Sequence, residues 1–174
     1  MLIKYDNSGV LSVREAVLGD MQAVVSVYSH HVKNGTGTFE EYPPSLVEMT
    51  ARWQSLHDGN YPYLVAEYDS ELAGFAYAGP YKQRSAYRFT VEDSIYVSPV
   101  HQRLGVGKSL LSALIQCATG NGFKQMMAVI GDSENAGSIG LHRAAGFNDI
   151  GVGTNLGFKH GRWLDIVYMQ RPLV

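Results

Sequence analysis

The stretch HQRLGVGKSLL, residues 101–111, decides how the rest of the sequence is interpreted. Gly105 and Gly107 come directly before an apolar run with helical spacing, so the stretch predicts a turn that opens a helix. The first N–H groups of a helix have no partner within it, and with the helix dipole they favour a bound anion. Glycine has no side chain to block a phosphate group. The stretch therefore predicts either a phosphate-binding turn or a glycine-rich turn that only enters a helix.

Two familiar phosphate-binding loops do not fit this stretch. A Walker A loop needs a glycine at position 102, which is Gln102, and a dinucleotide fingerprint needs one at position 110, which is Leu110. The strand expected before the turn, TVEDSIYV, carries Glu92, Asp93 and Ser94 in its middle. In those two folds this strand is buried on both faces and reads as continuously apolar. We therefore expect this strand to border a wet cleft instead.

The composition is that of a globular enzyme. The chain has 174 residues, of which 45% are hydrophobic and 17% charged, which is enough for one buried core. The net charge of −2 leaves no broad basic surface for nucleic acid. The one cysteine, Cys117, cannot form an internal disulfide, and its apolar neighbours favour a small core residue over a nucleophile. No metal-ligand pattern is recognised.

The sequence does not indicate a membrane protein. No apolar run reaches the roughly 18 residues of a membrane span, and residues 1–15 lack a signal-peptide core. We therefore expect a cytoplasmic protein with no membrane partner.

Hydrophobic periodicity predicts an α/β protein. Helices are expected at 20–32, where Asp20 suits an N-cap, and at 46–56, 105–119 and 135–145. Strands are expected at 11–17, 61–68, 71–80, 87–97, 124–132, from 147 onward, and at 162–170. This order predicts one mixed sheet flanked by helices. Since no linker interrupts the pattern, we expect one domain over residues 1–174 with a core at about 11–171.

Several segments resemble a known enzyme superfamily. Gln102 to Gly107 matches the Gln/Arg-x-x-Gly-x-Gly/Ala motif of the GCN5-related N-acetyltransferases, and SENAGSIGLHRAAGF (133–147) resembles their second cofactor segment. YRFTVEDSIYV (87–97) and GRWLDIVYMQ (161–170) resemble the branch that acetylates phosphinothricin and methionine sulfone. The resemblance runs from about Val13 to Gln170. It implies a mostly antiparallel sheet that splays between two central parallel strands, and a homodimer with the last strand near the interface. A buried core strand would explain the apolar residues of that strand equally well.

The resemblance also implies acetyl-CoA as cosubstrate, lying between residues 94–97 and 125–130. The backbone of the first strand would pair with the pantetheine arm, and the amides of the glycine turn would hold the pyrophosphate. Asn135 would lie near the pantetheine, although it could instead be only a helix N-cap. The implied cofactor-binding residues are Ile95, Tyr96, Val97, Gln102, Arg103, Leu104, Gly105, Val106, Gly107, Lys108, Asn135 and Ser138.

The implied reaction is attack of an amine on a thioester, which requires a base because alkyl ammonium groups are protonated at neutral pH. Glu92 is the candidate base, and a solvated carboxylate is the alternative. Asp93 would point to the opposite face of a regular strand, although a bulge could change this. His142, where many relatives have a tyrosine, could protonate the departing thiolate or be structural. A backbone N–H near Val97 would bind the oxyanion.

Positive charge near the expected catalytic strand favours a small zwitterionic acceptor, because arginine binds carboxylate, phosphinate or sulfone oxygens well. These residues could equally be solubilising charges. The candidate substrate-binding residues are Phe39, Glu40, Tyr81, Lys82, Arg84, Arg88, Thr90, Val91 and Glu92.

We therefore predict an acetyl-CoA-dependent N-acetyltransferase acting on the primary amine of phosphinothricin, methionine sulfone or methionine sulfoximine. Acetylation of protein N-termini or polyamines is one alternative, and the basic KQRSAYR segment (82–88) disfavours a polyamine. A non-catalytic CoA-binding sensor is another, which the presence of Glu92 beside an intact glycine turn disfavours. Gln102 and the lack of an acidic metal ligand disfavour nucleotide hydrolysis.

Overall fold

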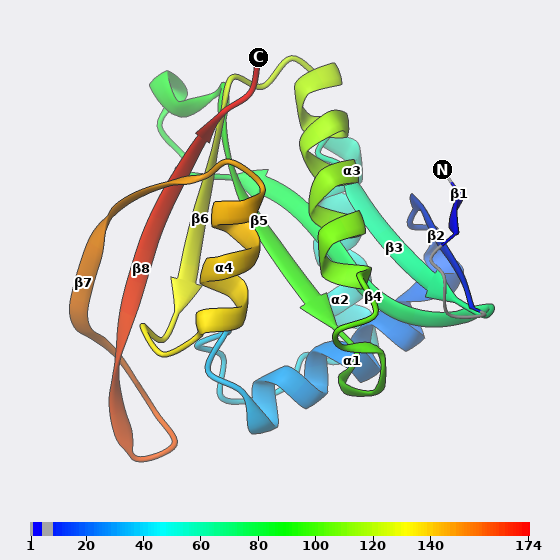
Figure 1. Ribbon diagram of the computed structural model, residues 1–174, viewed down its shortest axis with the longest axis horizontal. Helices are drawn as coiled ribbons and strands as arrows, with labels where there is room; N and C mark the ends of the chain where they lie inside the picture. Colours follow the sequence, from blue (N-terminus) through cyan, green and yellow to red (C-terminus); the bar gives the residue numbers. More distant parts are fainter. Residues whose placement is uncertain (1, 5–8) are drawn as a thin grey trace.

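The computed structural model describes residues 2–4 and 9–174, and for residues 2–4 it describes the backbone. The described strands form one eight-stranded sheet in the order β1-β2-β3-β4-β5-β6-β8-β7. Figure 1 shows helices on both faces of this sheet. The strands are β1 (Leu2–Lys4), β2 (Val10–Glu15), β3 (Tyr63–Tyr68), β4 (Glu71–Pro80), β5 (Thr90–Val97), β6 (Gln125–Gly131), β7 (Asn148–Lys159) and β8 (Arg162–Pro172). The helices are α1 (Met21–Asn34), α2 (Leu46–Asp58), α3 (Val106–Gly120) and α4 (Ala136–Ala144).

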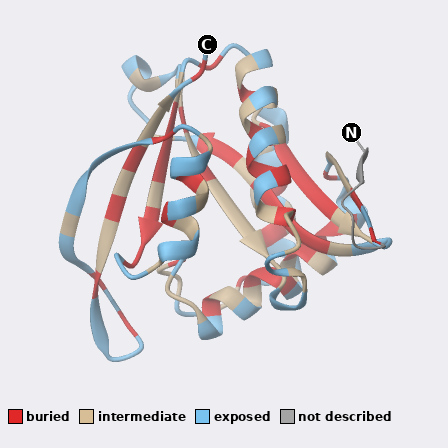
Figure 2. Cartoon of the chain, in the orientation of Figure 1, coloured by how far each residue is buried: buried red, intermediate tan, exposed pale blue. Residues whose placement is uncertain are grey.

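The sheet separates two apolar cores. Helices α3 and α4 pack on one face, where the stripe of α3 formed by Leu110, Leu111, Leu114 and Ala118 is fully buried. Helices α1 and α2 pack on the other face, around an aromatic cluster that includes Tyr28, Trp53 and Phe75. Figure 2 shows the buried residues concentrated on the central strands and on the helix faces turned toward them. The buried residues of α1 and α3 include most of their apolar stripes, whereas in α2 Met49 and Trp53 are buried and Leu46, at its start, is exposed.

The predicted fold class is confirmed, and three local details differ. Strand β1 was not predicted, because three residues carry too little pattern to recognise. Strand β5 begins at Thr90 rather than at 87, since Ser85–Tyr87 form a short 3₁₀ turn. The Asp20 carboxylate makes no cap bond to α1. It accepts a hydrogen bond from the Val17 N–H at 2.7 Å and pairs with Arg14 at 2.8 Å.

The central strands β5 and β6 pair in parallel and then separate. Their pairing runs from Thr90 opposite Gln125 to Asp93 opposite Ala128, and stops there. Beyond that point β5 continues to pair with β4, and β6 continues to pair with β8. Each strand thus keeps its outer neighbour while the sheet opens between residues 94–97 and 129–131. The expected splay is confirmed.

Strand β5 pairs with β4 in unbroken antiparallel register from Val91 to Val97. A bulge therefore does not alter the alternation of its side chains. Val91, Ile95 and Val97 belong to the core on the α3 face, whereas Tyr96 packs on the α1 face. Asp93 accordingly faces α3 and α4, and Glu92 faces α1 and α2.

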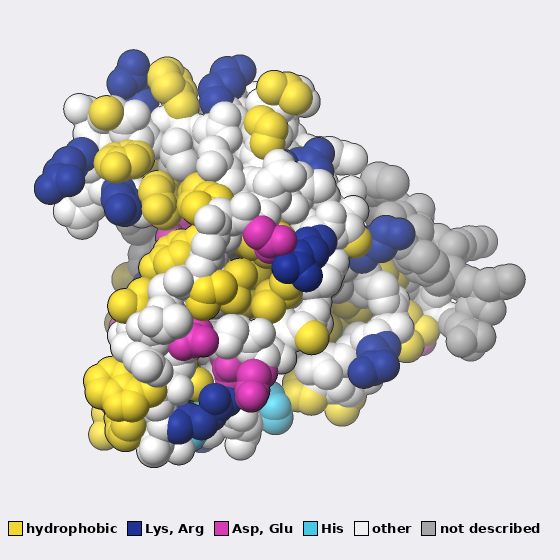
Figure 3. Space-filling model, turned by 60° about the vertical axis from the view of Figure 1, so that its left-hand side comes forward, with side chains coloured by type: hydrophobic (Ala, Val, Ile, Leu, Met, Phe, Trp, Pro, Cys, Tyr) yellow, Lys and Arg dark blue, Asp and Glu magenta, His cyan; other side chains and the backbone are white. Residues whose placement is uncertain are grey.

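The hairpin of β7 and β8 leaves apolar side chains in solvent. Figure 3 shows hydrophobic groups gathered on the face of the molecule that this edge presents. Five apolar side chains of the hairpin are more than half exposed: Ile150, Val152, Leu156, Phe158 and Trp163. In the described residues, no helix has the length and apolar composition needed to cross a membrane. The N-terminal stretch that lacks a signal-peptide core lies partly outside the described residues.

The close approach of β4 to β5 yields a stability prediction. A Cβ added to Gly74 would lie 2.7 Å from the Tyr96 carbonyl oxygen, a backbone atom that cannot move aside alone. We expect Gly74→Ala to lower the free energy of unfolding by about 1–3 kcal/mol, measured by urea denaturation. The matched control is Gly120→Ala at the end of α3, where nothing lies within 4 Å of the added carbon. Equal stabilities of the two variants would contradict the steric argument.

Candidate active site

The open end of the sheet leads into a cleft of about 840 Å³. Its walls come from β5, from β6, from the glycine turn that enters α3, and from the start of α4. Leu104 does not line it and packs against the core instead. Expected cofactor-binding residues that line the cleft are Ile95, Tyr96, Val97, Gln102, Arg103, Gly105, Val106, Gly107, Lys108, Asn135 and Ser138.

The backbone of β5 presents hydrogen-bonding groups to this cleft. The Ser98 N–H donates to the Ala73 carbonyl at 2.8 Å, whereas the Phe89 carbonyl accepts from Lys124, just before β6. Since these directions alternate along a strand, the groups of Ile95 and Val97 point into the opening. The backbone groups of Tyr96 point toward β4. Of these three residues, Ile95 and Val97 can therefore pair with a ligand in the opening, and Tyr96 cannot. The backbone groups of Ile95 and Val97 are the polar groups that an extended pantetheine arm requires.

The start of α3 has the geometry of an anion site. Gly105 precedes the helix with a φ of 82°, a left-handed conformation that favours glycine. The first bond within the helix runs from the Ser109 N–H to the Gly105 carbonyl at 3.0 Å. The N–H groups of Val106 and Gly107 precede that bond, and no side chain caps this end of α3. Lys108 adds positive charge beside them, so this end of the cleft suits a pyrophosphate.

The start of α4 is capped by Asn135. Its side-chain oxygen accepts a hydrogen bond from the Ser138 N–H at 3.2 Å. The N-cap interpretation of Asn135 is therefore confirmed. Because Asn135 also lines the cleft, the cap fixes the amide where a ligand could reach it.

Glu92 is a carboxyl group in an apolar setting. Burial, followed by the charge of Asp93, raises its pKa from 4.5 to about 7. A carboxylate with this pKa accepts a proton at neutral pH far better than an ordinary glutamate. It lies on the α1 and α2 side of β5, next to the point at which β5 and β6 separate. Glu92 is not among the residues that line the cleft, so its raised pKa is the feature that keeps it a candidate base.

Asp93 and His142 form a buried pair on the opposite side of β5. Their side chains meet at 2.9 Å, between Asp93 Oδ2 and His142 Nε2, and both residues are at most 6% exposed. His142 Nδ1 lies 2.7 Å from the Ser138 carbonyl oxygen. Burial alone would lower the pKa of His142, but the hydrogen bond and charge of Asp93 raise it overall. Both residues line the cleft.

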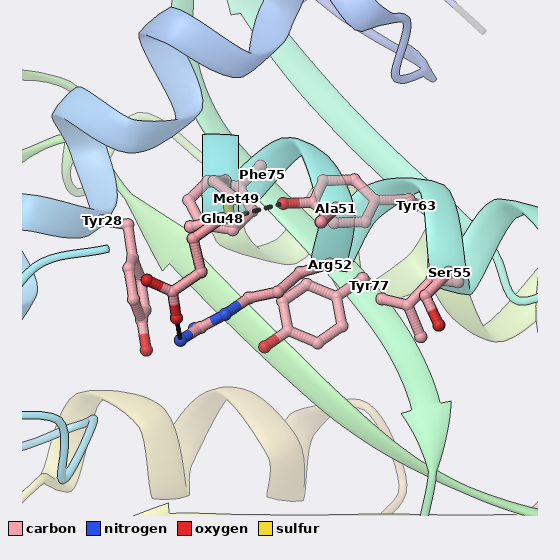
Figure 4. A pocket seen from close by; sticks show the side chains of 10 residues that line it. Tyr28, Glu48, Met49, Ala51, Arg52, Ser55, Tyr63, Phe75 and Tyr77 are labelled. Carbon is pink, nitrogen blue, oxygen red and sulfur yellow. Dashed lines mark hydrogen bonds and ion pairs between the residues drawn. The ribbon is translucent and has the colours of Figure 1, made fainter. Parts of the chain in front are cut away.

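A second cavity, of about 570 Å³, lies between α2 and the sheet. Figure 4 shows Arg52 from α2 extending past the Tyr77 ring toward Glu48. The guanidinium contacts Glu40 and Glu48 at 2.6 Å each. Burial raises the pKa of Tyr77, and the charges of Arg52, Glu40 and Glu92 also act on this side chain. Tyr77, which lines this cavity, is therefore close enough to Glu92 for the charge of Glu92 to act on it.

The sequence did not single out Arg52, Tyr77 or His31. His31 lines the cleft, and its Nε2 donates to the Val97 carbonyl at 2.9 Å. Burial lowers the pKa of His31, so the imidazole is neutral at neutral pH. The i, i+4 spacing of Glu48 and Arg52 was a usable signal for a helical ion pair. His31 gave no comparable signal, because its partner lies in a strand far along the chain.

The predicted substrate-binding residues fall into separate groups. Glu40 joins Arg52, and Phe39 packs beside Gly131 and Gly157, on β6 and β7. In the connection from β4 to β5, Lys82 lies over the ring of Tyr81, with 5.1 Å from Nζ to the ring centroid. The other predicted residues there are Arg84 and Arg88, which are exposed, and Thr90, which is partly exposed.

Val91 does not join any of these groups. Its side chain is fully buried in the core on the α3 face, opposite to Glu92. Among the described residues, no cluster of His, Cys, Asp or Glu suits a metal ion.

A parallel pair of strands that splays beside an uncapped helix N-terminus is the architecture of an acetyl-CoA-dependent N-acetyltransferase. The model of the acetyltransferase (GNAT) family matches residues 24–147, and the chain belongs to this family. Phosphinothricin N-acetyltransferase of Alcaligenes faecalis is 51% identical over 154 residues, which cover 88% of this chain and 78% of that protein. L-methionine sulfoximine/L-methionine sulfone acetyltransferase of Pseudomonas aeruginosa is 38% identical over 163 residues, covering 93% and 94%.

A solved structure agrees with these relatives. The GNAT superfamily phosphinothricin acetyltransferase from Sinorhizobium meliloti, in complex with AcCoA, superimposes with a TM-score of 0.91 at 47% identity. The superposition covers 94% of this chain and 88% of that one. The cleft between β5 and β6 has the backbone groups and the helix terminus that this acyl donor needs.

The pKa of Glu92 makes a prediction about stability. Because the folded protein holds this proton more tightly than the unfolded chain, wild type loses stability as pH rises from 4.5 to about 7. Glu92→Gln removes this loss. We expect the variant to gain about 1–2 kcal/mol over wild type between pH 4.5 and pH 8, less than the full shift because the side chain is partly exposed.

Urea denaturation at both pH values measures this difference. Glu71→Gln, at an exposed position on β4, is the control and should follow wild type. A stability difference between Glu92→Gln and wild type that does not change with pH would contradict the buried ionisation.

Proposed function

We propose that this protein transfers the acetyl group of acetyl-CoA to the α-amine of a small amino acid of the phosphinothricin or methionine sulfoximine type. The observation that supports the proposal is that Glu92, next to the point where β5 and β6 separate, has its pKa raised to about 7. The relatives from Alcaligenes and Pseudomonas support the class of acceptor. We take residues 1–174 as a single N-acetyltransferase domain.

The acyl donor is held by backbone groups in this proposal. Ile95 and Val97 pair with the pantetheine arm, and the first turn of α3 binds the pyrophosphate. Asn135 and Ser138 lie on the opposite wall of the cleft. The acyl donor then supplies a thioester as the activated acetyl group, and the protein supplies position and proton transfer.

Glu92 removes a proton from the acceptor's ammonium group. The freed amine attacks the thioester carbonyl, and the Val97 N–H stabilises the negative oxygen that forms. When the carbon–sulfur bond breaks, its electron pair leaves with sulfur, and His142 provides the proton that sulfur needs. The amide nitrogen loses its second proton, so one proton is released overall.

The acceptor side suits an amine that also carries an anionic group. Lys82, Arg84 and Arg88 provide cations on the connection to β5. A polyamine would need carboxylates free to bind it, but Glu40 and Glu48 are both paired with Arg52. An acceptor with one amine and an oxyanion therefore fits this side better.

Release of free CoA thiol, measured with a panel of amines, tests the proposal. Wild type should turn over phosphinothricin, methionine sulfone or methionine sulfoximine much faster than spermidine or an N-terminal peptide. Glu92→Gln should lower turnover by roughly 10²–10⁴, and Glu71→Gln should leave it unchanged. Tight binding of acetyl-CoA without turnover of any amine would contradict the proposal and indicate a sensor.

We also propose a homodimer formed through the hairpin of β7 and β8. Five exposed apolar side chains on one hairpin are unusual for a monomer, and Phe158 and Trp163 stack edge to face at 5.3 Å. A second copy of the same hairpin could cover them in a two-fold interface.

Sedimentation of wild type and Trp163→Ser tests the interface. Wild type should sediment as a dimer, and the variant should shift toward the monomer because it loses an aromatic contact at the centre of the patch. Val47→Ser is the control, since Val47 is an exposed apolar residue on α2, outside the hairpin. A monomeric wild type, or the same shift in both variants, would contradict the interface.

A further inference from the structure

The pair formed by Asp93 and His142 has a geometry that restricts where its protons lie. A carbonyl oxygen can only accept a hydrogen bond, so the His142 nitrogen 2.7 Å from the Ser138 carbonyl carries a proton. The other nitrogen, Nε2, lies 2.9 Å from Asp93 Oδ2. A second proton must lie between these two atoms. The pair is therefore either an imidazolium with a carboxylate or a neutral imidazole with a carboxylic acid.

The surroundings of the pair contain few charges. The strand partners of Asp93 are Ala78 on β4 and Ala128 on β6. The ring of Phe147 packs edge to face against His142, with 5.0 Å between the centroids. From α3 the pair faces buried apolar side chains, and the neighbouring titratable group is Glu92 on β5. In such a setting an isolated charge is costly, whereas a hydrogen-bonded ion pair is tolerated.

The location of the pair links it to the reaction. Asp93 is the last residue of β5 that pairs with β6, so the cleft opens directly beyond it. Its second oxygen, Oδ1, is buried and has no hydrogen-bond partner among the described residues. Asp93 and His142 line the cleft, whereas Glu92 is not among its lining residues and points to the opposite face of β5.

We propose that Asp93 is a positioning residue that keeps His142 doubly protonated at the inner end of the cleft, ready to protonate the departing thiolate. This inference rests on the proposed function and adds Asp93 to it. Asp93 also acts on the base, because its negative charge contributes to the raised pKa of Glu92. One carboxylate thus influences both the acid and the base.

The proton balance of this step is complete. His142 gives one proton to the sulfur that leaves with the electron pair of the broken carbon–sulfur bond. The Nε2–H is held by Asp93, so the proton comes from Nδ1, whose bond to the Ser138 carbonyl must break in this step. The neutral imidazole and the Asp93 carboxylate then recover a proton from water. Glu92 passes to solvent the protons that it takes from the amine, so the cycle releases one proton for each acetyl group transferred.

Nitrogen-15 NMR of the imidazole ring tests the protonation state without turnover. In wild type we expect both His142 ring nitrogens to be protonated at neutral pH. In Asp93→Asn, Nε2 should lose its proton at lower pH. Asp149→Asn is the matched control, because Asp149 pairs with Arg143 at the exposed end of the same helix. It should give the wild-type spectrum.

The wild-type spectrum alone can overturn the proposal. A neutral His142 ring at pH 7, with its proton on Asp93 instead, would do so whether or not Asp93→Asn folds. The spectrum needs no acceptor, so a failure of the proposed acetyl transfer would be seen separately in the turnover assay.

Kinetics of single and double variants test the link to catalysis. Asp93→Asn should lower kcat about tenfold or more and leave the KM for acetyl-CoA within a factor of about three. Both limbs of its pH profile should move to lower pH. The charge of Asp93 raises the pKa of both Glu92 and His142, and the variant removes that charge. Asp93→Asn combined with His142→Gln should be no slower than His142→Gln alone. If the rate losses of the two single variants multiply in the double variant, and the limbs of the pH profile do not move, Asp93 has only a structural role.

Discussion

The loss of pairing between β5 and β6 beyond Asp93 and Ala128 is the constraint on which the rest of the site depends. In a continuous sheet the backbone groups of Ile95 and Val97 would be satisfied by the neighbouring strand. Here they face the cleft, and among the described residues only His31 reaches one of them, at the Val97 carbonyl. An extended ligand that takes the place of the missing strand satisfies the remaining groups. The outer partners β4 and β8 stabilise both strands, so the opening can persist without a ligand.

The alternation of side chains along β5 gives this opening two different walls. Glu92 faces the helices α1 and α2 and lies near Tyr77, whereas Asp93 faces α4 and holds His142. A base and an acid in direct contact would exchange their proton and cancel each other. In the proposed mechanism Glu92 and His142 lie on opposite faces of one strand, where one acts on the amine and the other on the sulfur. The unbroken register between β4 and β5 is therefore part of the chemistry, because a one-residue slip would exchange the two walls.

The sequence predicted the parts of this arrangement that depend on local pattern. Helical periodicity located α3, and the two glycines located its exposed N-terminus, because both signals lie within a few residues. Strict alternation also placed Glu92 and Asp93 on opposite faces, and the regular register of β5 bears this out. Asp20 was wrongly expected to cap α1, because Arg14 on the preceding strand competes for its carboxylate. Asp20 is the residue before α1, as predicted. Local helix propensity could not reveal its ion pair with Arg14.

The roles of His142, Arg52 and His31 needed the tertiary structure, since each contacts residues distant in sequence or on another element. His142 illustrates the point, because its partner Asp93 lies 49 residues away. The same contact argues that the buried charges serve function rather than stability. An apolar pair at positions 93 and 142 would avoid the cost of burying ions. A residue that does not ionise at position 92 would avoid the loss of stability above pH 4.5. The proposed mechanism accounts for these costs, because it uses all three groups for proton transfer near neutral pH.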